Sequence, residues 1–255
     1  PENRALLAER DRLQAAIDSQ PAAKAIFPDI RSMIRQVHGQ LEAKPVTLTV
    51  KDDEGGEQQV VIDRATMQGI ASGMIADPAS AAILLHMYRE LAAGGTSMLH
   101  MVIPRYFMPG GPIRLDAMPT AMDAASGIGE ARLARVTEQG RTALLGLALN
   151  FPMPQIRDAI PGLDLGDAFR QEPRSDVPTL LLTGTLDGRT YPEGQAEAVA
   201  ELGNVTRVSI RNAGHNLFMT TPEVTRAIEA FLNGGAVPAE IVVPLPDFTS
   251  PTPPG

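Results

Sequence analysis

The feature that most constrains the fold is an alternation of strand-like and helix-like segments near the C-terminus. Residues 179–183 (TLLLT) form a short apolar run, typical of a strand buried on both faces of a parallel sheet. Residues 193–202 then show a helical pattern, residues 204–210 form a second strand, and residues 222–232 form a closing helix. Parallel strands need such helical crossovers. We therefore predict an α/β fold with a parallel sheet here.

Each predicted strand is followed by a loop that ends in a titratable residue. The sequence GTLD leads to Asp187 after the first strand, and NAGH leads to His215 after the second. Ligands bind beyond the carboxyl ends of parallel strands. A carboxylate at that edge can accept a hydrogen bond from the imidazole Nδ1–H while the other ring nitrogen takes a proton from a nucleophile. The pairing and its place after two consecutive strands favour catalytic roles over a turn aspartate and a structural histidine.

These motifs carry a resemblance. Residues 177–234, with G-x-x-D after one strand and G-H after the last, resemble the C-terminal segment of α/β-hydrolase-fold enzymes. In that fold the catalytic triad runs Ser, acid, His along the chain, which implies that Asp187 is the acid and His215 the base of a serine hydrolase. The preceding part, with FPD at 27–29 and PVTLTV at 45–50, looks like the cap of the branch containing proline iminopeptidase-like and tripeptidyl aminopeptidase-like hydrolases. The resemblance implies a small ester or short peptide as substrate.

The organisation expected from this reading has three parts. Residues 1–175 are expected to form a mainly helical cap or lid, with a surface β-hairpin near residues 46–62. Residues 176–235 are expected to be the C-terminal βαβα part of the hydrolase core, and residues 236–255 a Pro-rich extended tail. Helical patterns in the first part cover residues 4–19, 27–42, 64–75, 78–93 and 130–149.

The nucleophile that such an acid and base require is missing. A nucleophile elbow reads G-x-S-x-G on a strand-to-helix turn. Ser97 has Gly95 before it but Leu99 after it, and Ser72 and Ser126 lack both flanking glycines. Two sheet-central strands are also too few for a hydrolase sheet of about eight. We therefore predict that the nucleophilic Ser and the oxyanion hole belong to an N-terminal part that is a separate partner chain or was removed.

Two other readings stay open at the level of sequence. A non-catalytic ligand-binding protein on a hydrolase scaffold would explain the absent serine, although such a scaffold would not need an intact Asp187 and His215. Within the hydrolases, a carboxylesterase would differ from an aminopeptidase in substrate rather than in machinery.

Composition excludes several other classes of function. A net charge of −8 disfavours a nucleic-acid partner, which needs clustered Lys and Arg. The chain has no cysteine, so it has no disulfide, thiol nucleophile or cysteine zinc site. The remaining histidines, His38, His86 and His100, show no metal-binding spacing and are expected to pack or lie on the surface. No cofactor and no membrane span are expected, and an exported (periplasmic or secreted) or a cytoplasmic location fits equally.

Several polar residues near the predicted site have ordinary explanations. Arg189 and Glu193 follow the acid and are expected to form ion pairs or to favour a helix N-terminus. Asp123 and Glu130 could hold the free amine of a peptide substrate but are expected to lie on a solvated face. Asn216 is expected to brace the turn beside His215.

Overall fold

The computed structural model of the chain describes residues 12–51, 56–106, 115–171 and 174–251. These residues form two compact units, each built from separate stretches of chain. The first, here called the core unit, comprises the described parts of residues 1–30, 73–86 and 172–255, and the second, the helical unit, comprises those of 31–72 and 87–171. The helix predicted over 4–19 is observed over 12–18, and its beginning lies outside the described residues.

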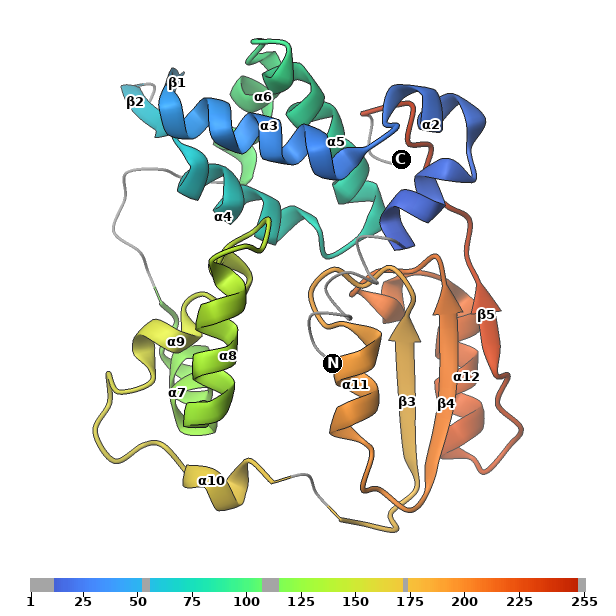
Figure 1. Ribbon diagram of the computed structural model, residues 1–255. Coiled ribbons are helices and arrows are strands. Elements are labelled where there is room, and N and C mark those ends of the chain that lie inside the picture. The colour runs from blue at the N-terminus through green and yellow to red at the C-terminus, as the bar shows by residue number, and fades with distance from the viewer. Residues whose placement is uncertain (1–11, 52–55, 107–114, 172–173, 252–255) are drawn as a thin grey trace. The chain divides into compact units, whose positions relative to one another are not determined.

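The core unit contains a three-stranded parallel sheet in the order β3-β4-β5, which gives this part of the chain the predicted α/β class (Figure 1). The strands are β3 (Thr179–Gly184), β4 (Val205–Arg211) and β5 (Glu240–Val242). Thr179 lies opposite Val205 in the first pairing, and Ser209 lies opposite Glu240 in the second. Both predicted strands are thus present and parallel, and their carboxyl ends share one edge of the sheet.

Two helices of the core unit connect these strands. They are α11 (Pro192–Ala198) and α12 (Pro222–Leu232), and a short 3-10 helix, η2 (Leu217–Met219), precedes α12. Each α-helix begins with a proline, which suits the first turn because its missing N–H would have no partner there. Val224 and Ala227 of α12 are buried in one cluster with Val208 and Ile210 of β4 and with Ile241 of β5. Burial of this apolar stripe fixes α12 against the sheet.

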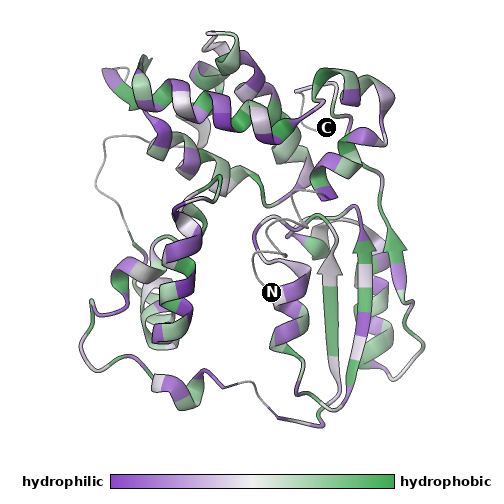
Figure 2. Ribbon diagram, viewed as in Figure 1, coloured by the Kyte–Doolittle hydropathy of each residue, from purple (hydrophilic) through white to green (hydrophobic). Residues whose placement is uncertain are grey.

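Strand β3 is less buried than its sequence predicts. Figure 2 shows the middle of the strand as strongly hydrophobic, yet residues 179–183 are all only partly buried. Strand β4, with a more polar sequence, buries Val208 and Ile210 completely. Val208 and Ile210 are covered by Val224 and Ala227 of α12, and residues 209–211 of β4 lie between two strands, whereas β3 pairs on one side only among the described residues.

Residues 236–255 differ from the expected extended tail. They contribute β5, and Phe248 beyond it is fully buried. Gln20, just before α2 (Pro21–Ile26), holds this segment with its side-chain amide, which donates to Pro246 O at 2.8 Å and accepts from Phe248 N at 3.2 Å. The ring of His86 adds a contact of 3.0 Å to Phe248 O. Side chains thus supply the hydrogen bonds that the proline-rich backbone cannot make within a regular strand.

The helical unit contains the predicted hairpin and most of the helices. Strands β1 (Val46–Lys51) and β2 (Glu57–Ile62) are antiparallel, and residues 52–55 of the predicted hairpin lie outside the described residues. Alternate residues of β1, Leu48 and Val50, are buried, as the period of two requires. The helices that lie wholly or partly in this unit are α3 (Ile30–Ala43), α4 (Arg64–Met74), α5 (Pro78–Ala92), α6 (Ser97–Tyr106), α7 (Ala117–Ser126), α8 (Glu130–Gly140), η1 (Ala148–Asn150), α9 (Met153–Ile156) and α10 (Gly166–Phe169).

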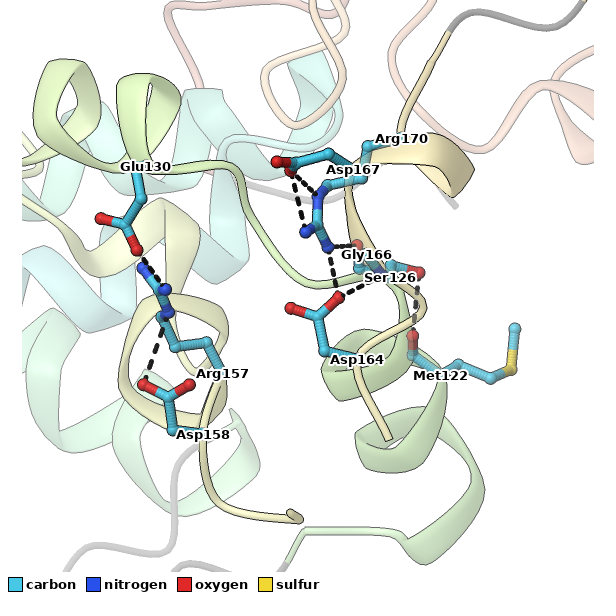
Figure 3. A network of polar contacts seen from close by, with 9 residues as sticks. All are labelled: Met122, Ser126, Glu130, Arg157, Asp158, Asp164, Gly166, Asp167 and Arg170. Atoms are coloured by element: carbon cyan, nitrogen blue, oxygen red, sulfur yellow. Dashed lines mark hydrogen bonds and ion pairs between the residues drawn. The ribbon is translucent and has the colours of Figure 1, made fainter. Parts of the chain in front are cut away.

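Polar contacts rather than a large core hold the segment from α7 to α10 (Figure 3). Ala124 is the buried residue of α7, and α8 and α10 have none. The guanidinium of Arg170 donates to Asp164, to Asp167 and to the backbone oxygen of Ser126. The hydrogen bond from Arg170 lowers the pKa of the Asp164 carboxyl. The ion pairs between Arg170 and its acidic partners therefore hold this segment together at its surface.

Candidate active site

The acid candidate, Asp187, lies in a tight turn three residues beyond β3. Its Oδ1 accepts hydrogen bonds from the backbone N–H groups of Arg189 at 2.9 Å and Thr190 at 2.8 Å. An aspartate that accepts from amides two and three residues ahead forms its own turn. The side chain is 3 % exposed, so the turn keeps the carboxylate out of water. Its second oxygen, Oδ2, bonds to residues outside the turn.

The second oxygen of Asp187 has two further donors. His215 Nδ1 lies 3.1 Å from Oδ2, and Gln195 Nε2 donates to the same oxygen at 3.3 Å. Gln195 also donates to Thr190 O at 2.7 Å and accepts from Thr183 Oγ1 at 2.8 Å. Its amide therefore connects the end of β3, the acid turn and α11.

Gln195 is a site residue that sequence reasoning missed. It lies in the first turn of α11, the helix that follows the acid turn directly. A long polar side chain eight residues after a candidate acid is a weak signal, because a glutamine on a partly exposed helix is ordinary. Only the fold shows that it reaches back to Asp187.

The loop that carries His215 is fixed by Asn212. Its backbone has a φ of 70°, in the left-handed region that Asn tolerates better than most residues. The Asn212 side chain donates to Val243 O at 2.8 Å, and its N–H donates to Thr185 Oγ1 at 2.9 Å. The base loop is thus bonded both to the segment after β5 and to the start of the acid loop.

The two loops also meet backbone to backbone. Leu186 N donates to Ala213 O at 2.9 Å, and Thr185 N donates to Ile210 O at 3.1 Å. A Cβ added at Gly184 would overlap the backbone oxygen of Gly214. Glycine is required at this position because any side chain would push the loops apart.

The hydrogen bonds of the pair indicate which of the two ring nitrogens of His215 carries the proton. Asp187 accepts from three other N–H donors, so its carboxylate acts as an acceptor toward His215 and Nδ1 carries the hydrogen. This leaves the Nε2 lone pair available, and the imidazole is 35 % exposed. Among the described residues, no hydrogen bond to Nε2 is found. A ring held in this way can accept a proton from a neighbouring hydroxyl.

The other polar candidates are engaged elsewhere. Glu193 forms an ion pair with Arg12, and Glu130 of the helical unit forms one with Arg157. Arg189 contributes its backbone N–H to the acid turn. Asn216 bonds to Asp77 through its side-chain amide at 2.6 Å, in keeping with the expected bracing of the turn.

The remaining histidines make structural contacts within one unit each. His38 Nε2 lies 2.8 Å from Tyr88 Oη in the helical unit, and burial lowers the pKa of His38 to about 4. In the core unit, His86 contacts Phe248 O at 3.0 Å. In the helical unit, the exposed His100 of α6 contacts the backbone oxygen of Thr96, the residue before that helix, at 3.0 Å. The part of the chain that the structure describes holds no cluster of three or more acidic or histidine side chains suited to a metal ion. Nor does any described helix have the length and apolar content needed to cross a membrane.

The three serines tested as nucleophiles lie in helices. Ser72 Oγ donates to Gly69 O at 2.8 Å, and Ser126 Oγ donates to Met122 O at 2.8 Å. Ser97 is the first residue of α6. None of the three stands on a strand-to-helix turn, where a nucleophile elbow would place it.

Comparison with protein families matches residues 164–243, the stretch that contains all three strands of the parallel sheet together with Asp187 and His215. The match is to the TAP-like protein family. The TAP-like segment is the C-terminal part of an α/β-hydrolase fold, which agrees with its parallel sheet and helices, and it supports a hydrolase. It covers less than half of the chain and leaves most of the helical unit outside. A comparison with curated proteins gives no match.

Proposed function

We propose that this chain supplies the acid and base of a serine hydrolase. The observation that carries the proposal is the hydrogen bond of 3.1 Å between His215 Nδ1 and the buried carboxylate of Asp187, placed at the carboxyl edge of a parallel sheet. The TAP-like match over the same residues adds support from an independent source. The two loops are hydrogen-bonded to one another and have glycines where they approach most closely. This arrangement suits the presentation of such a pair.

In the proposed reaction, His215 Nε2 removes the proton from a serine hydroxyl as that oxygen attacks an ester or amide carbonyl. Asp187 holds the ring in the Nδ1–H tautomer and stabilises the imidazolium that forms. His215 then returns the proton to the leaving group, and water releases the acyl group by the same steps in reverse roles.

We propose further that the serine and the oxyanion hole belong to an N-terminal part outside these 255 residues, either a separate chain or one that was removed. The edge of β3 that has no partner strand among the described residues supports this. Among the described residues β3 pairs with β4 alone, and its three leucines (residues 180–182) are only partly buried. An apolar strand with an open edge invites pairing with another strand, and natural proteins cover or protect such edges.

Labelling with a fluorophosphonate probe tests the proposal on the protein purified from its natural source. The expected result is a labelled second polypeptide that carries G-x-S-x-G and copurifies with this chain. A single species with the mass of this chain and full activity would contradict the separate part. If no polypeptide reacts, the non-catalytic ligand-binding alternative, which the helical placement of Ser72, Ser97 and Ser126 favours, replaces the hydrolase.

The substrate class follows from a second measurement. Both an aminopeptidase-like enzyme and a carboxylesterase are compatible with the pair, because acyl transfer uses the same groups for amides and esters. Turnover of an aminoacyl anilide compared with a p-nitrophenyl ester distinguishes them. We propose the aminopeptidase-like activity first, since the matched segment belongs to the TAP-like family.

A further inference from the structure

Residues 75–77, between α4 and α5, lie against both loops of the candidate site. A Cβ added at Gly188, directly after Asp187, would overlap the backbone oxygen of Ile75. A Cβ added at Gly214, directly before His215, would overlap Asp77 and the backbone oxygen of Ala76. All of these residues belong to the core unit. One short segment from the middle of the chain therefore touches the neighbours of both candidate catalytic residues.

Hydrogen bonds connect the same segment to the base loop. His215 N donates to Ala76 O at 2.9 Å. Asp77 accepts twice from the next residue, from Asn216 N on Oδ1 at 3.3 Å and from Asn216 Nδ2 on Oδ2 at 2.6 Å. The backbone at His215 and Asn216 is thus held from residues that lie 139 positions away in the sequence.

The contacts of Asp77 are unusual for its position. It stands just before Pro78, the first residue of α5, and its backbone oxygen accepts from Ala81 N at 2.9 Å. An aspartate at such a position commonly turns its carboxylate onto the amides of the first helical turn. Asp63, just before α4, does so through a bond of 2.8 Å from Thr66 N. At Asp77 both carboxylate oxygens instead face Asn216.

We propose that Asp77 is a positioning residue for His215. By accepting hydrogen bonds from Asn216, Asp77 fixes the backbone next to His215 and so keeps the imidazole Nδ1 within hydrogen-bond distance of the Asp187 carboxylate. This inference rests on the proposed function for its catalytic meaning, but the alignment of the ring is a property of this chain alone. Small displacements of a base can lower the rate of a reaction greatly, because proton transfer requires a close and directed approach.

Nuclear magnetic resonance of His215 tests the proposal without any nucleophile. In the native chain we expect the ring nitrogen shifts of neutral His215 to report the Nδ1–H tautomer. In Asp77→Ala we expect a mixture of the two tautomers of His215. Asp63→Ala is the matched control, since it removes an aspartate from the same position before a helix in the other unit and should leave the His215 signals unchanged.

Asn216→Ala provides a second route if Asp77→Ala fails to fold. It removes the bond of 2.6 Å from the other side and should perturb the tautomer in the same direction. The native tautomer in both variants would overturn the positioning role. In the active protein, Asp77→Ala should slow fluorophosphonate labelling by about tenfold. Absence of labelling in the native protein would contradict the proposed function, while the tautomer measurement would still decide the role of Asp77.

Discussion

The carboxylate of Asp187 is surrounded by donors. Each of its oxygens accepts two hydrogen bonds: Oδ1 from the amides of Arg189 and Thr190, and Oδ2 from Gln195 and His215. A buried carboxylate with four donors is fully satisfied and cannot rotate without breaking several bonds. The orientation of His215 is therefore set by a residue that is itself fixed, as a catalytic acid requires.

The first prediction concerns this pair. His215→Ala should lower the turnover of the assembled hydrolase by about 10⁴-fold or more, because the general base is lost. Asp187→Asn should lower it somewhat less, since the imidazole remains but its tautomer is no longer imposed. Steady-state kinetics on an activated ester measures both effects, with circular dichroism to verify folding. His100→Ala, which removes an exposed histidine of α6, is the control, and a His215→Ala variant with near-native turnover would refute the assignment.

A second prediction at this scale concerns His38. Its side chain is 4 % exposed, and burial, aided by the charge of Arg64, lowers its pKa from 6.5 to about 4. The folded chain therefore keeps His38 neutral where the unfolded chain protonates it. Below about pH 6.5 protons favour unfolding, and the contribution of His38 to the free energy of unfolding falls by about 1.4 kcal/mol per pH unit until about pH 4.

The substitution His38→Gln tests this, since glutamine can still bond to Tyr88 but does not titrate. Urea denaturation at several pH values should show a flatter dependence in this variant between about pH 6.5 and 4. An identical slope in His38→Gln and the native chain would contradict the assignment.

At the scale of elements, the C-terminal segment is part of the core. Phe248 is fully buried, and Gln20 and His86 bond to the backbone on either side of it. These contacts join the last segment to the residue before α2 and to the part of α5 that lies in the same unit. The segment therefore stabilises the core unit even though only three of its residues form a strand.

Replacing Phe248 by Ala should lower the free energy of unfolding by about 3–5 kcal/mol, through lost burial and the cavity that remains. The matched control is Phe218→Ala, because Phe218 is 72 % exposed and its removal should change stability by about 0.5 kcal/mol or less. Chemical denaturation of both variants makes the comparison. Equal stabilities would show that the segment is dispensable.

At the scale of the whole molecule, the parallel sheet is the feature that supports the proposed N-terminal part. Strand β3 contains three consecutive leucines, yet among the described residues it pairs on one side only. Strands of this composition are usually found in the interior of parallel sheets. The proposed N-terminal part would supply the strand that covers this edge.

Hydrogen exchange measures this directly. In the isolated chain, the β3 amides that do not point toward β4 should exchange rapidly, while those of residues 209–211 of β4, which lie between β3 and β5, should be protected. In the protein from its natural source, the same β3 amides should be protected by the added strand. Equal exchange in the two samples would show that the edge stays open and would contradict the proposed assembly at this place.

Much of the fold follows from patterns that are local in the sequence. The strands at 179–183 and 204–210, the closing helix and the hairpin are visible as periods of two or 3.6 residues, because each element buries one face or one stripe. Strand β5 was not predicted, since three residues are too few to show a period and prolines lie on both sides of them. The helix expected over 130–149 ends at Gly140, where turns and η1 follow.

By itself, the sequence determined the class of the C-terminal part and singled out Asp187 and His215, because a parallel sheet brings the ends of consecutive strands to one edge. Tertiary structure alone decided what surrounds them. Gln195, Asp77 and Gln20 act through side-chain hydrogen bonds to partners that lie 8, 139 and up to 228 positions away, and such bonds leave no periodic trace in a sequence. The loop sequences predict where a carboxylate and an imidazole can meet. The contacts around these two side chains decide how firmly they are held.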